Sequence, residues 1–196
     1  MTLKILNLYA GIGGNRKLWS GDIKVTAVEI VPEIAAIYKE FFPDDEVIIA
    51  DAHQYLLDHY KEFDFIWSSP PCQSHSQTNM FLNAQGVIRY PDMTLWQEII
   101  FLRTFCKSKY VVENVKPYYP KVFVPEIVIG RHFFWSNFDI SAYQGKVDCV
   151  GRFGPTKNGR TDEKDRIIRN MVGAEIGLHI FNCAFKDKQT LIGDIL

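Results

Sequence analysis

The segment 63–76, FDFIWSSPPCQSHS, restricts the possible folds more than any other part of the chain. It opens with a short apolar run, typical of a strand that is buried on both faces of its sheet. Pro70 and Pro71 cannot continue a central strand, because proline has no backbone N–H to donate to the ladder. We therefore expect the chain to leave the sheet at about Ser68 and to enter a polar loop that carries Cys72.

The position of Cys72 suggests a chemical role. In an open α/β sheet, ligands bind in the crevice outside the carboxyl ends of the strands, and the predicted strand would deliver this thiol there as a candidate nucleophile. The alternative is a small buried apolar side chain, which is the commoner fate of an intracellular cysteine. The flanking Pro-Pro and Gln-Ser-His-Ser sequences are typical of a polar loop and favour the nucleophile.

Length and composition limit the class of protein. A chain of 196 residues is long enough for one α/β domain with its own core and short for two, so we predict a single domain over residues 1–196. The absence of a signal peptide and of any run of about 18 apolar residues predicts a soluble, cytoplasmic protein without a membrane partner. No Cys-x-x-Cys pair occurs, so we expect no metal site; the four cysteines are Cys72, Cys106, Cys149 and Cys183.

Three predicted strands end in residues suited to a nucleotide-like ligand. Residues 4–10 lead into Gly11-Ile12-Gly13-Gly14, which predicts a tight turn and then a short helix through Leu18 and Trp19. A second strand over 23–28 ends at Glu29, 18 residues after Gly11, about the spacing at which an acid binds a ribose. A third strand over 47–50 ends at Asp51. Either acid could instead be a solvated carboxylate, but together the three ends predict a pocket for an adenosine-like group.

The rest of the chain alternates between helical and strand patterns. Helices are expected to begin at Pro32 and to cover 52–60, 93–105 and 165–181, and strands are expected over 109–115 and 131–138. The polar stretch 73–92 reads as a mobile loop over the site. This alternation predicts an α/β fold with a mostly parallel central sheet and helices on both faces.

Charge is unevenly distributed along the chain. The formal net charge of -1 gives no general basic surface of the kind that nucleic-acid-binding proteins carry. Residues 145–169, however, contain seven basic and four acidic residues within a glycine-rich stretch. Such a stretch is usually a solvated loop, but beside a nucleotide-handling crevice its Arg152, Lys157 and Arg160 become candidates for phosphate contacts.

Taken in order, these residues resemble the DNA cytosine-5 methyltransferase family. Residues 8–14 look like its first S-adenosylmethionine motif, and Ser69-Pro70-Pro71-Cys72-Gln73 looks like its Pro-Cys-Gln nucleophile motif. Glu113-Asn114-Val115 is similar to its Glu-Asn-Val motif. The resemblance implies a Rossmann-like, S-adenosylmethionine-dependent methyltransferase fold. It also implies methyl transfer to carbon 5 of cytosine in DNA, for purposes such as restriction-modification.

The resemblance assigns roles to individual residues. Cys72 would add to carbon 6 of a flipped cytosine while Glu113 holds ring nitrogen 3 and the amino group, and flipping costs a few kcal/mol. The cofactor would be S-adenosylmethionine, leaving as S-adenosylhomocysteine, with Glu29 on the ribose and Asp51 on the adenine amino group. The implied catalytic set is Cys72, Glu113, Asn114 and Arg131. The implied cofactor set is Tyr9, Ala10, Gly11, Ile12, Gly13, Gly14, Glu29, Ile30, Asp51, Ala52, Pro71 and Gly173. The implied nucleic-acid set is Gln73, Ser74, Ser76, Arg152, Lys157 and Arg160.

The chain departs from the family in three places. The Gln-x-Arg-x-Arg motif is represented by residues 127–131, in which only Arg131 remains to contact the base carbonyl. The terminal Gly-Asn motif reads Gly173-Ala174. The basic loop 141–162 stands in place of a large target-recognition domain. We therefore expect low specificity, a very short target, or recognition supplied by a separate specificity subunit or a second copy of the chain.

Two other functions remain open on the sequence. The first is a non-catalytic S-adenosylmethionine-binding subunit of a larger complex, which the missing recognition domain favours and the intact nucleophile motif disfavours. The second keeps the chemistry but changes the substrate to RNA or another pyrimidine carrier.

Overall fold

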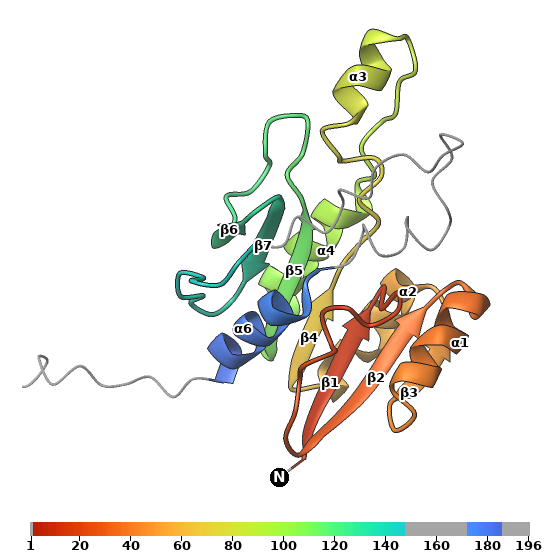
Figure 1. Cartoon of the computed structure of the whole chain (residues 1–196), viewed down its shortest axis with the longest axis vertical. Helices are drawn as coiled ribbons and strands as arrows, with labels where there is room; N and C mark the ends of the chain where they lie inside the picture. Colours follow the sequence, from red (N-terminus) through yellow and green to blue (C-terminus); the bar gives the residue numbers. More distant parts are fainter. Residues whose placement is uncertain (1, 148–171, 186–196) are drawn as a thin grey trace, which may run out of the picture.

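A computed structural model describes residues 2–147 and 172–185, which contain a single seven-stranded sheet of order β3-β2-β1-β4-β5-β7-β6 (Figure 1). Strands β1 to β5 are parallel, and β7 lies antiparallel between β5 and β6. The predicted mostly parallel sheet is therefore confirmed. The strands are β1 Leu3–Leu8, β2 Ile23–Glu29, β3 Glu46–Ile49, β4 Phe65–Ser68, β5 Lys109–Val115, β6 Ile127–Ile129 and β7 His132–Ser136.

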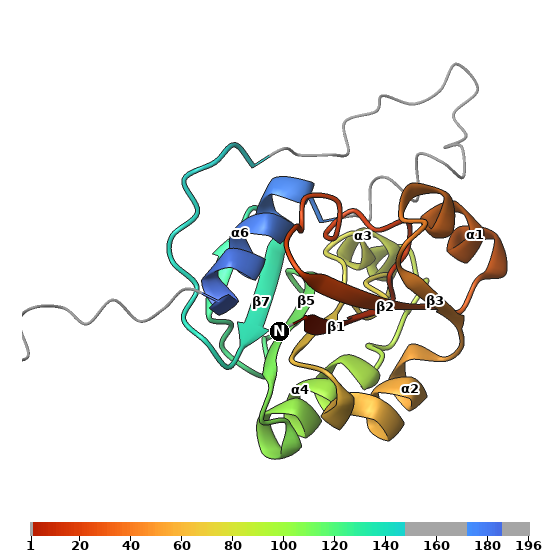
Figure 2. The ribbon, with the colours of Figure 1, turned by 90° about the horizontal axis from the view of Figure 1, so that it is seen from below.

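Helices cover both faces of this sheet (Figure 2). α1 (Pro32–Phe41) and α6 (Ala174–Phe185) lie on one face, and α2 (Ala52–His59) and α4 (Thr94–Phe105) on the other. Because side chains alternate along a strand, Phe65 and Trp67 of β4 pack beside α6, whereas Ile66 packs beside α2 and α4. This arrangement accounts for the continuous apolar run of β4, which is buried on both sides.

The strand order identifies where a ligand crevice should form. From β1 the chain proceeds outward to β2 and β3, then returns to place β4 and β5 on the other side of β1. The order therefore reverses between β1 and β4, and their carboxyl ends open the crevice of such a sheet. The glycine turn follows β1 and the Cys72 loop follows β4, so both predicted motifs meet at this point.

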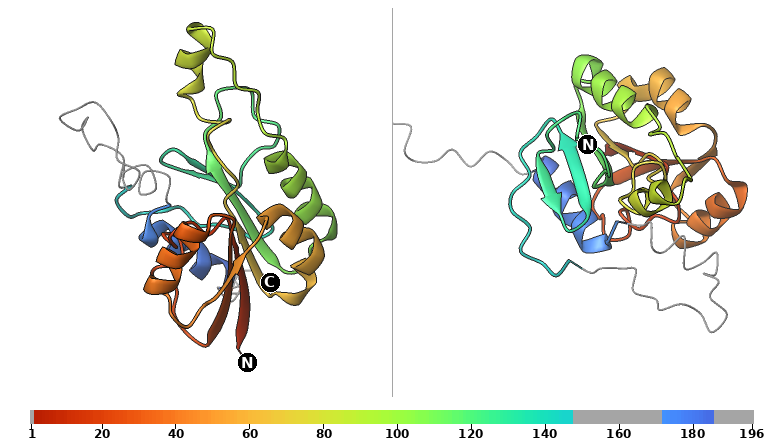
Figure 3. Two further views of the ribbon diagram at one scale, coloured as in Figure 1. Left: turned by 90° about the vertical axis from the view of Figure 1, so that its right-hand side faces the viewer. Right: turned by 90° about the horizontal axis from the view of Figure 1, so that it is seen from above.

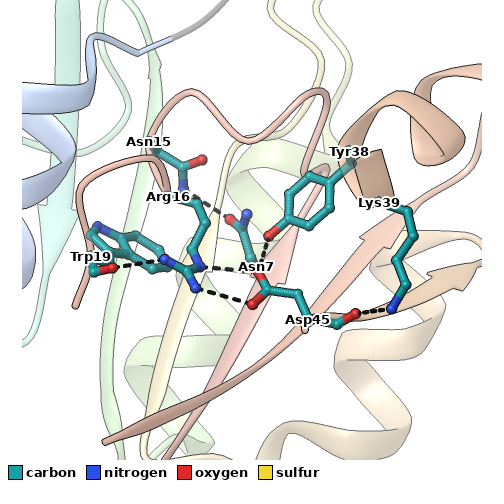
Figure 4. A network of polar contacts seen from close by, with 7 residues as sticks. All are labelled: Asn7, Asn15, Arg16, Trp19, Tyr38, Lys39 and Asp45. Carbon is teal, nitrogen blue, oxygen red and sulfur yellow. Dashed lines mark hydrogen bonds and ion pairs between the residues drawn. The ribbon is translucent and has the colours of Figure 1, made fainter. Parts of the chain in front are cut away.

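The turn after β1 differs from the prediction. Instead of a short helix through Leu18 and Trp19, residues 13–19 form successive turns in which Arg16 N donates to Gly13 O and Trp19 N donates to Arg16 O. Arg16 explains the difference, because its guanidinium contacts both carboxylate oxygens of buried Asp45 at 3.0 Å (Figure 4). These contacts fix the turn against the segment between α1 and β3.

Two further contacts complete the support of the turn. The hydroxyl of Tyr38 donates to Asp45 at 2.8 Å, and Asn15 Nδ2 donates to Asn7 Oδ1 at 2.9 Å. Helix α6 approaches from the other side, where Trp19 Nε1 donates to Gly177 O at 3.1 Å. A Cβ atom at Gly177 would lie 2.1 Å from Asn15 O, so only glycine permits this approach.

Residues 73–92, which we call the arm, contain the helix α3 (Asn79–Ala84) where a loop was predicted. The arm extends beyond the carboxyl edge of the sheet (Figures 1 and 3). Its base is fixed, since Asp92 N donates to Ser74 Oγ at 3.0 Å and Tyr118 Oη donates to Arg89 O at 2.9 Å.

Two other predictions concern the carboxyl-terminal part. Helix α6 begins at Ala174, and residues 165–171 of the predicted final helix lie outside the described residues. The short strand β6 was not predicted. Within residues 2–147 and 172–185, none of the helices has the length and apolar character needed to span a bilayer.

Candidate functional site

A pocket of about 350 Å³ lies at the carboxyl ends of the central strands, a volume within the range of small-molecule sites. It brings together twelve of the residues predicted for cofactor, base or nucleic acid. These are Tyr9, Ala10, Gly11, Ile12, Gly14, Glu29, Ile30, Pro71, Cys72, Gln73, Glu113 and Arg131.

Glu29, at the end of β2, is buried and held by backbone groups on both of its oxygens. Gly11 N donates to Oε2 at 2.9 Å, and Val31 N donates to Oε1 at 3.0 Å. A carboxylate accepts about four hydrogen bonds, so both oxygens keep capacity for hydroxyl donors. This arrangement fits a ribose, whose two vicinal hydroxyls are donors.

The glycines of the turn serve different purposes. Gly11 has φ of +54° and lines the pocket, and a Cβ there would meet no atom within 4 Å, so its backbone is open to a ligand. Gly13 has φ of +80°, and a Cβ there would lie 2.2 Å from the ring of Phe42. Gly13 is therefore needed for packing against α1 and does not line the pocket.

The thiol of Cys72 lies half-buried in the same pocket. Burial raises the pKa of Cys72, and the charge of Glu113 raises this pKa further, whereas Arg131 lowers it. Cys72 thus lies at the pocket, where the sequence predicted it, and its surroundings favour the neutral thiol over the thiolate.

Glu113 lies on β5 and is buried beside the first residues of β7. His132 Nδ1 lies 2.5 Å from Glu113 Oε1, and Arg131 Nε donates to His132 Nε2 at 3.1 Å. Arg131 itself is exposed at the rim of the pocket. A carboxylate, an imidazole and a guanidinium thus form a continuous polar row along one wall.

Asn114 points to the opposite face of β5 from Glu113, as successive residues of a strand must. Its Nδ2 donates to Pro70 O at 2.9 Å, and its Oδ1 accepts from Val115 N at 2.9 Å. Asn114 does not line the pocket. It connects the strand of Glu113 to the backbone of the loop that carries Cys72.

A second buried carboxylate, Glu98 of α4, contacts the ends of β1 and β4. Tyr9 Oη and Ser68 Oγ each donate to it at 2.6 Å, and His53 Nδ1 lies 3.1 Å away. The hydrogen bond to Glu98 raises the pKa of His53, although burial opposes the shift. This group ties the ends of β1 and β4 to α2 and α4.

Several predicted site residues do not line the pocket. Asp51 is exposed and caps α2, where its Oδ1 accepts from Gln54 N at 2.8 Å. Ser74 fixes the base of the arm, and Ser76 Oγ accepts from Thr78 Oγ1 at 3.0 Å. The ligand-binding roles of these residues stay predictions. The others outside the lining are Gly13, Ala52, Asn114 and Gly173. Arg152, Lys157 and Arg160 lie outside the described residues.

Sequence reasoning missed part of the lining. His132 was read as one residue of an aromatic strand, and only its position after Arg131 in an alternating strand could have drawn attention to it. The other lining residues that were not predicted are Asn15, Val31, Ile34, Ser69, Pro70, Val115 and Val172.

Comparisons with known proteins connect this geometry to a family. Residues 3–119, more than half of the chain, match the family model described as C-5 cytosine-specific DNA methylase, and the matched region includes both Cys72 and Glu113. A tRNA (cytosine(38)-C(5))-methyltransferase from Spodoptera frugiperda is 34% identical over 90 residues, which cover 42% of this chain and 27% of that protein. The chain thus spans about a quarter of this curated relative.

Solved structures show weaker likeness. A mutant of Spodoptera frugiperda DNMT2 is 29% identical with a TM-score of 0.43, covering 59% of this chain and 36% of that one. A SAM-dependent methyltransferase from Agrobacterium tumefaciens is 16% identical with a TM-score of 0.38, covering 59% of this chain and 39% of that one. The assignment of this chain to a family therefore rests on the family-model match over residues 3–119 and not on these TM-scores. The chain belongs to the C-5 cytosine-specific DNA methylase family.

Proposed function

We propose that the chain transfers a methyl group from S-adenosylmethionine to carbon 5 of cytosine in DNA. The observation that carries this proposal is that Cys72, Glu113 and Glu29 line one pocket. The family match over the segment that contains all three residues supports it. A separate nucleophile, base-holding acid and ribose-binding acid are what this reaction requires.

The reaction needs covalent catalysis because carbon 5 of cytosine is a poor nucleophile. Cys72 Sγ, once deprotonated, forms a bond to carbon 6, and the ring electrons move toward carbon 5. Glu113 holds ring nitrogen 3 and the amino group of the base, which stabilises the resulting enamine. Carbon 5 takes up the methyl group and then loses its proton to water as the base, and the electrons of that C–H bond restore the double bond and expel the Cys72 thiolate.

The residues around Glu29 fit the cofactor that the family uses. The buried carboxylate and the open backbone at Gly11 would hold the ribose, and Ile30 beside them offers an apolar surface to a flat ring. When bound there, S-adenosylmethionine supplies the electrophilic methyl group. The base must leave its stack to enter the pocket, at a cost of a few kcal/mol.

A second candidate substrate is RNA. The observation that favours it is the similarity to a relative whose name describes methylation of tRNA at cytosine 38. That similarity covers a minor part of both chains, so DNA remains the first candidate because of the family match.

A labelled-methyl assay decides between these substrates. The purified chain is incubated with methyl-labelled S-adenosylmethionine and unmodified DNA, RNA or free nucleotides. We expect label on DNA, and Cys72→Ser should abolish transfer while leaving cofactor binding within about twofold. Label on RNA alone would move the assignment to the second candidate. Cofactor binding without transfer to any substrate would identify a non-catalytic binding subunit instead.

Recognition of the target belongs to the same proposal. The basic stretch 141–162 offers far less surface than a recognition domain, so we propose that a separate specificity subunit or a second copy of the chain contributes to it. Light scattering of the purified chain with and without DNA measures the stoichiometry. A monomer that methylates one defined sequence would contradict the need for a partner.

A further inference from the structure

The pairing of β5 and β7 places His132 next to Glu113. In their antiparallel register Glu113 lies opposite Phe134 and Val115 lies opposite His132, so Glu113 and His132 are diagonal neighbours on one face of the sheet. Both side chains are buried, with exposed fractions of 7% and 9%. The distance of 2.5 Å from His132 Nδ1 to Glu113 Oε1 places the two groups in direct hydrogen-bond contact.

The contact with Arg131 fixes the direction of this hydrogen bond. An arginine nitrogen can only donate, so His132 Nε2 must accept from Arg131 Nε. The imidazole proton is then on Nδ1, from which it is donated to Glu113 Oε1. The result is a directed chain in which guanidinium donates to imidazole and imidazole donates to carboxylate.

We propose that His132 is a positioning residue that holds Glu113 and Arg131 as one unit for binding a pyrimidine base. The inference rests on the proposed function, because it assigns the unit to the base. With Oε1 engaged by His132, rotation of the carboxylate is restricted and its second oxygen keeps a fixed direction. Arg131 is the one arginine that remains of the family's Gln-x-Arg-x-Arg motif, and His132 supplies the support that the missing residues would give.

The cost of removing this support follows from burial. A buried carboxylate that loses its hydrogen-bond partner pays its desolvation penalty and turns toward any remaining donor. A displacement of about 1 Å in a reacting geometry can slow a reaction about 10²-fold. His132→Phe keeps a ring of similar shape without either nitrogen, and it should produce a slowing of about that size.

Three variants test the role of His132. In His132→Asn the amide nitrogen approximates the place of Nδ1 and can still donate to Glu113, whereas in His132→Gln the amide lies near the place of Nε2. We measure the rate of covalent adduct formation on DNA and RNA oligonucleotides that contain 5-fluorocytosine, and cofactor affinity by calorimetry. The Phe and Gln variants should be slowed about 10²-fold. The Asn variant should stay within about tenfold of the wild type, and cofactor affinity should not change in any variant.

A double-mutant cycle separates positioning from general structure. If His132 acts through Glu113, then His132→Phe should add little, less than about twofold, in a Glu113→Ala background, which leaves no acceptor for Nδ1. Equal slowing in both backgrounds would show that His132 acts independently and would overturn the inference, as would a His132→Phe variant with wild-type adduct rate.

A spectroscopic measurement keeps the inference distinct from the proposed function. Nitrogen-15 NMR of the imidazole should show a neutral ring protonated on Nδ1, with a signal that moves in Glu113→Gln. A ring protonated on Nε2 would overturn the inference even if the wild type forms adducts. If the wild type forms no adduct on DNA or RNA, the proposed function fails, and the NMR result alone decides whether His132 positions Glu113.

Discussion

The thiol of Cys72 lies between groups that act on its pKa in opposite directions. Burial and the charge of Glu113 raise the pKa, and Arg131 lowers it. A thiol that is protonated in the resting protein is protected from unselective oxidation and alkylation, since the thiolate is the reactive form. In the proposed reaction, a base that contacts Glu113 would change this balance.

Replacing Glu113 tests this balance directly. Glu113→Gln removes a negative charge beside the thiol, so the pKa of Cys72 should fall and its alkylation by iodoacetamide should become faster at neutral pH. The thiolate fraction changes about tenfold for each pH unit below the pKa. The rate at Cys72 is followed by mass spectrometry as a function of pH. Glu62→Gln, at an exposed carboxylate before β4, is the control and should leave the profile unchanged. A higher midpoint in Glu113→Gln would contradict the charge effect.

At individual residues, the sequence predicted the pocket-lining side chains that lie in local motifs. Cys72 and Glu113 each follow an apolar run that identifies a strand end, so their positions could be predicted without knowing the sheet order. His132 could not be identified this way. Its contact with Glu113 depends on β7 pairing antiparallel with β5 in one particular register, and no short-range pattern specifies that register.

The elements around the site are joined by buried polar groups rather than by apolar contacts alone. Glu98 of α4 accepts from Tyr9 after β1 and from Ser68 of β4, and it contacts His53 of α2. These hydrogen bonds therefore join the ends of β1 and β4 to two helices on one face of the sheet.

The His53–Glu98 contact predicts a dependence of stability on pH. The folded-state pKa of His53 lies above its ordinary value of 6.5, so its stabilisation is fully present below that value and is lost as pH rises through the folded pKa. The unfolding free energy lost in His53→Gln should therefore be larger at about pH 6 than at about pH 9. Urea denaturation at both values measures it. His59→Gln, on the more exposed end of α2, is the control, and an equal loss at both pH values would rule out the charged contact.

The close approach of α6 to the turn can be tested at Gly177. Gly177→Ala would place Cβ 2.1 Å from Asn15 O, and a backbone carbonyl cannot rotate away. We expect a loss of about 1–3 kcal/mol in unfolding free energy, although alanine is the better helix former. The exposed Asn182→Ala in the same helix should be neutral or slightly stabilising. A stabilised Gly177→Ala in thermal or urea unfolding would show that α6 does not approach the turn so closely.

Helices and strands with clear periodicity were predicted well, and the exceptions have physical causes. α1, α4 and β5 lie where their apolar spacing indicated. The helix expected after the glycine turn is absent because the side chains of Arg16 and Asn15 are hydrogen-bonded to Asp45 and Asn7. These hydrogen bonds hold the backbone in successive turns. α3 was missed because the arm that carries it exposes apolar side chains, including Phe81 at 75%, and so lacks an amphipathic pattern.

Across the whole molecule, strand order converts separate sequence motifs into one site. The turn after β1, the acid at the end of β2, the thiol after β4 and the acid of β5 are up to about a hundred residues apart, yet they share one edge of the sheet. The alternation of elements predicted this edge from the sequence. Residues 148–171, which carry the predicted phosphate contacts, lie outside the described part of the chain, so their role stays a prediction.

The phosphate contacts predicted for the basic residues of the stretch 145–169 can be tested by substitution. Replacing Arg152, Lys157 and Arg160 together by alanine should weaken DNA binding most at low salt and reduce the slope of log affinity against log salt by about 2–3. Fluorescence anisotropy over a range of salt concentrations measures this slope. Lys24, Lys61 and Lys109, exposed at the amino-terminal side of the strands, give a matched triple variant that should retain the slope. An unchanged slope in the first variant would count against phosphate contacts.

Asn114 joins Pro70, two residues before the thiol, to the strand that bears Glu113. The Cys72 loop is consequently tied to β5 by a buried hydrogen bond from the Asn114 amide to a main-chain carbonyl, and this bond does not involve the side chains of Cys72 and Glu113. In the proposed reaction, changes of the chain beyond Gln73 would alter target binding while this connection between Cys72 and Glu113 is kept. If the chain transfers methyl groups as proposed, a site anchored in this way would suit combination with interchangeable recognition parts.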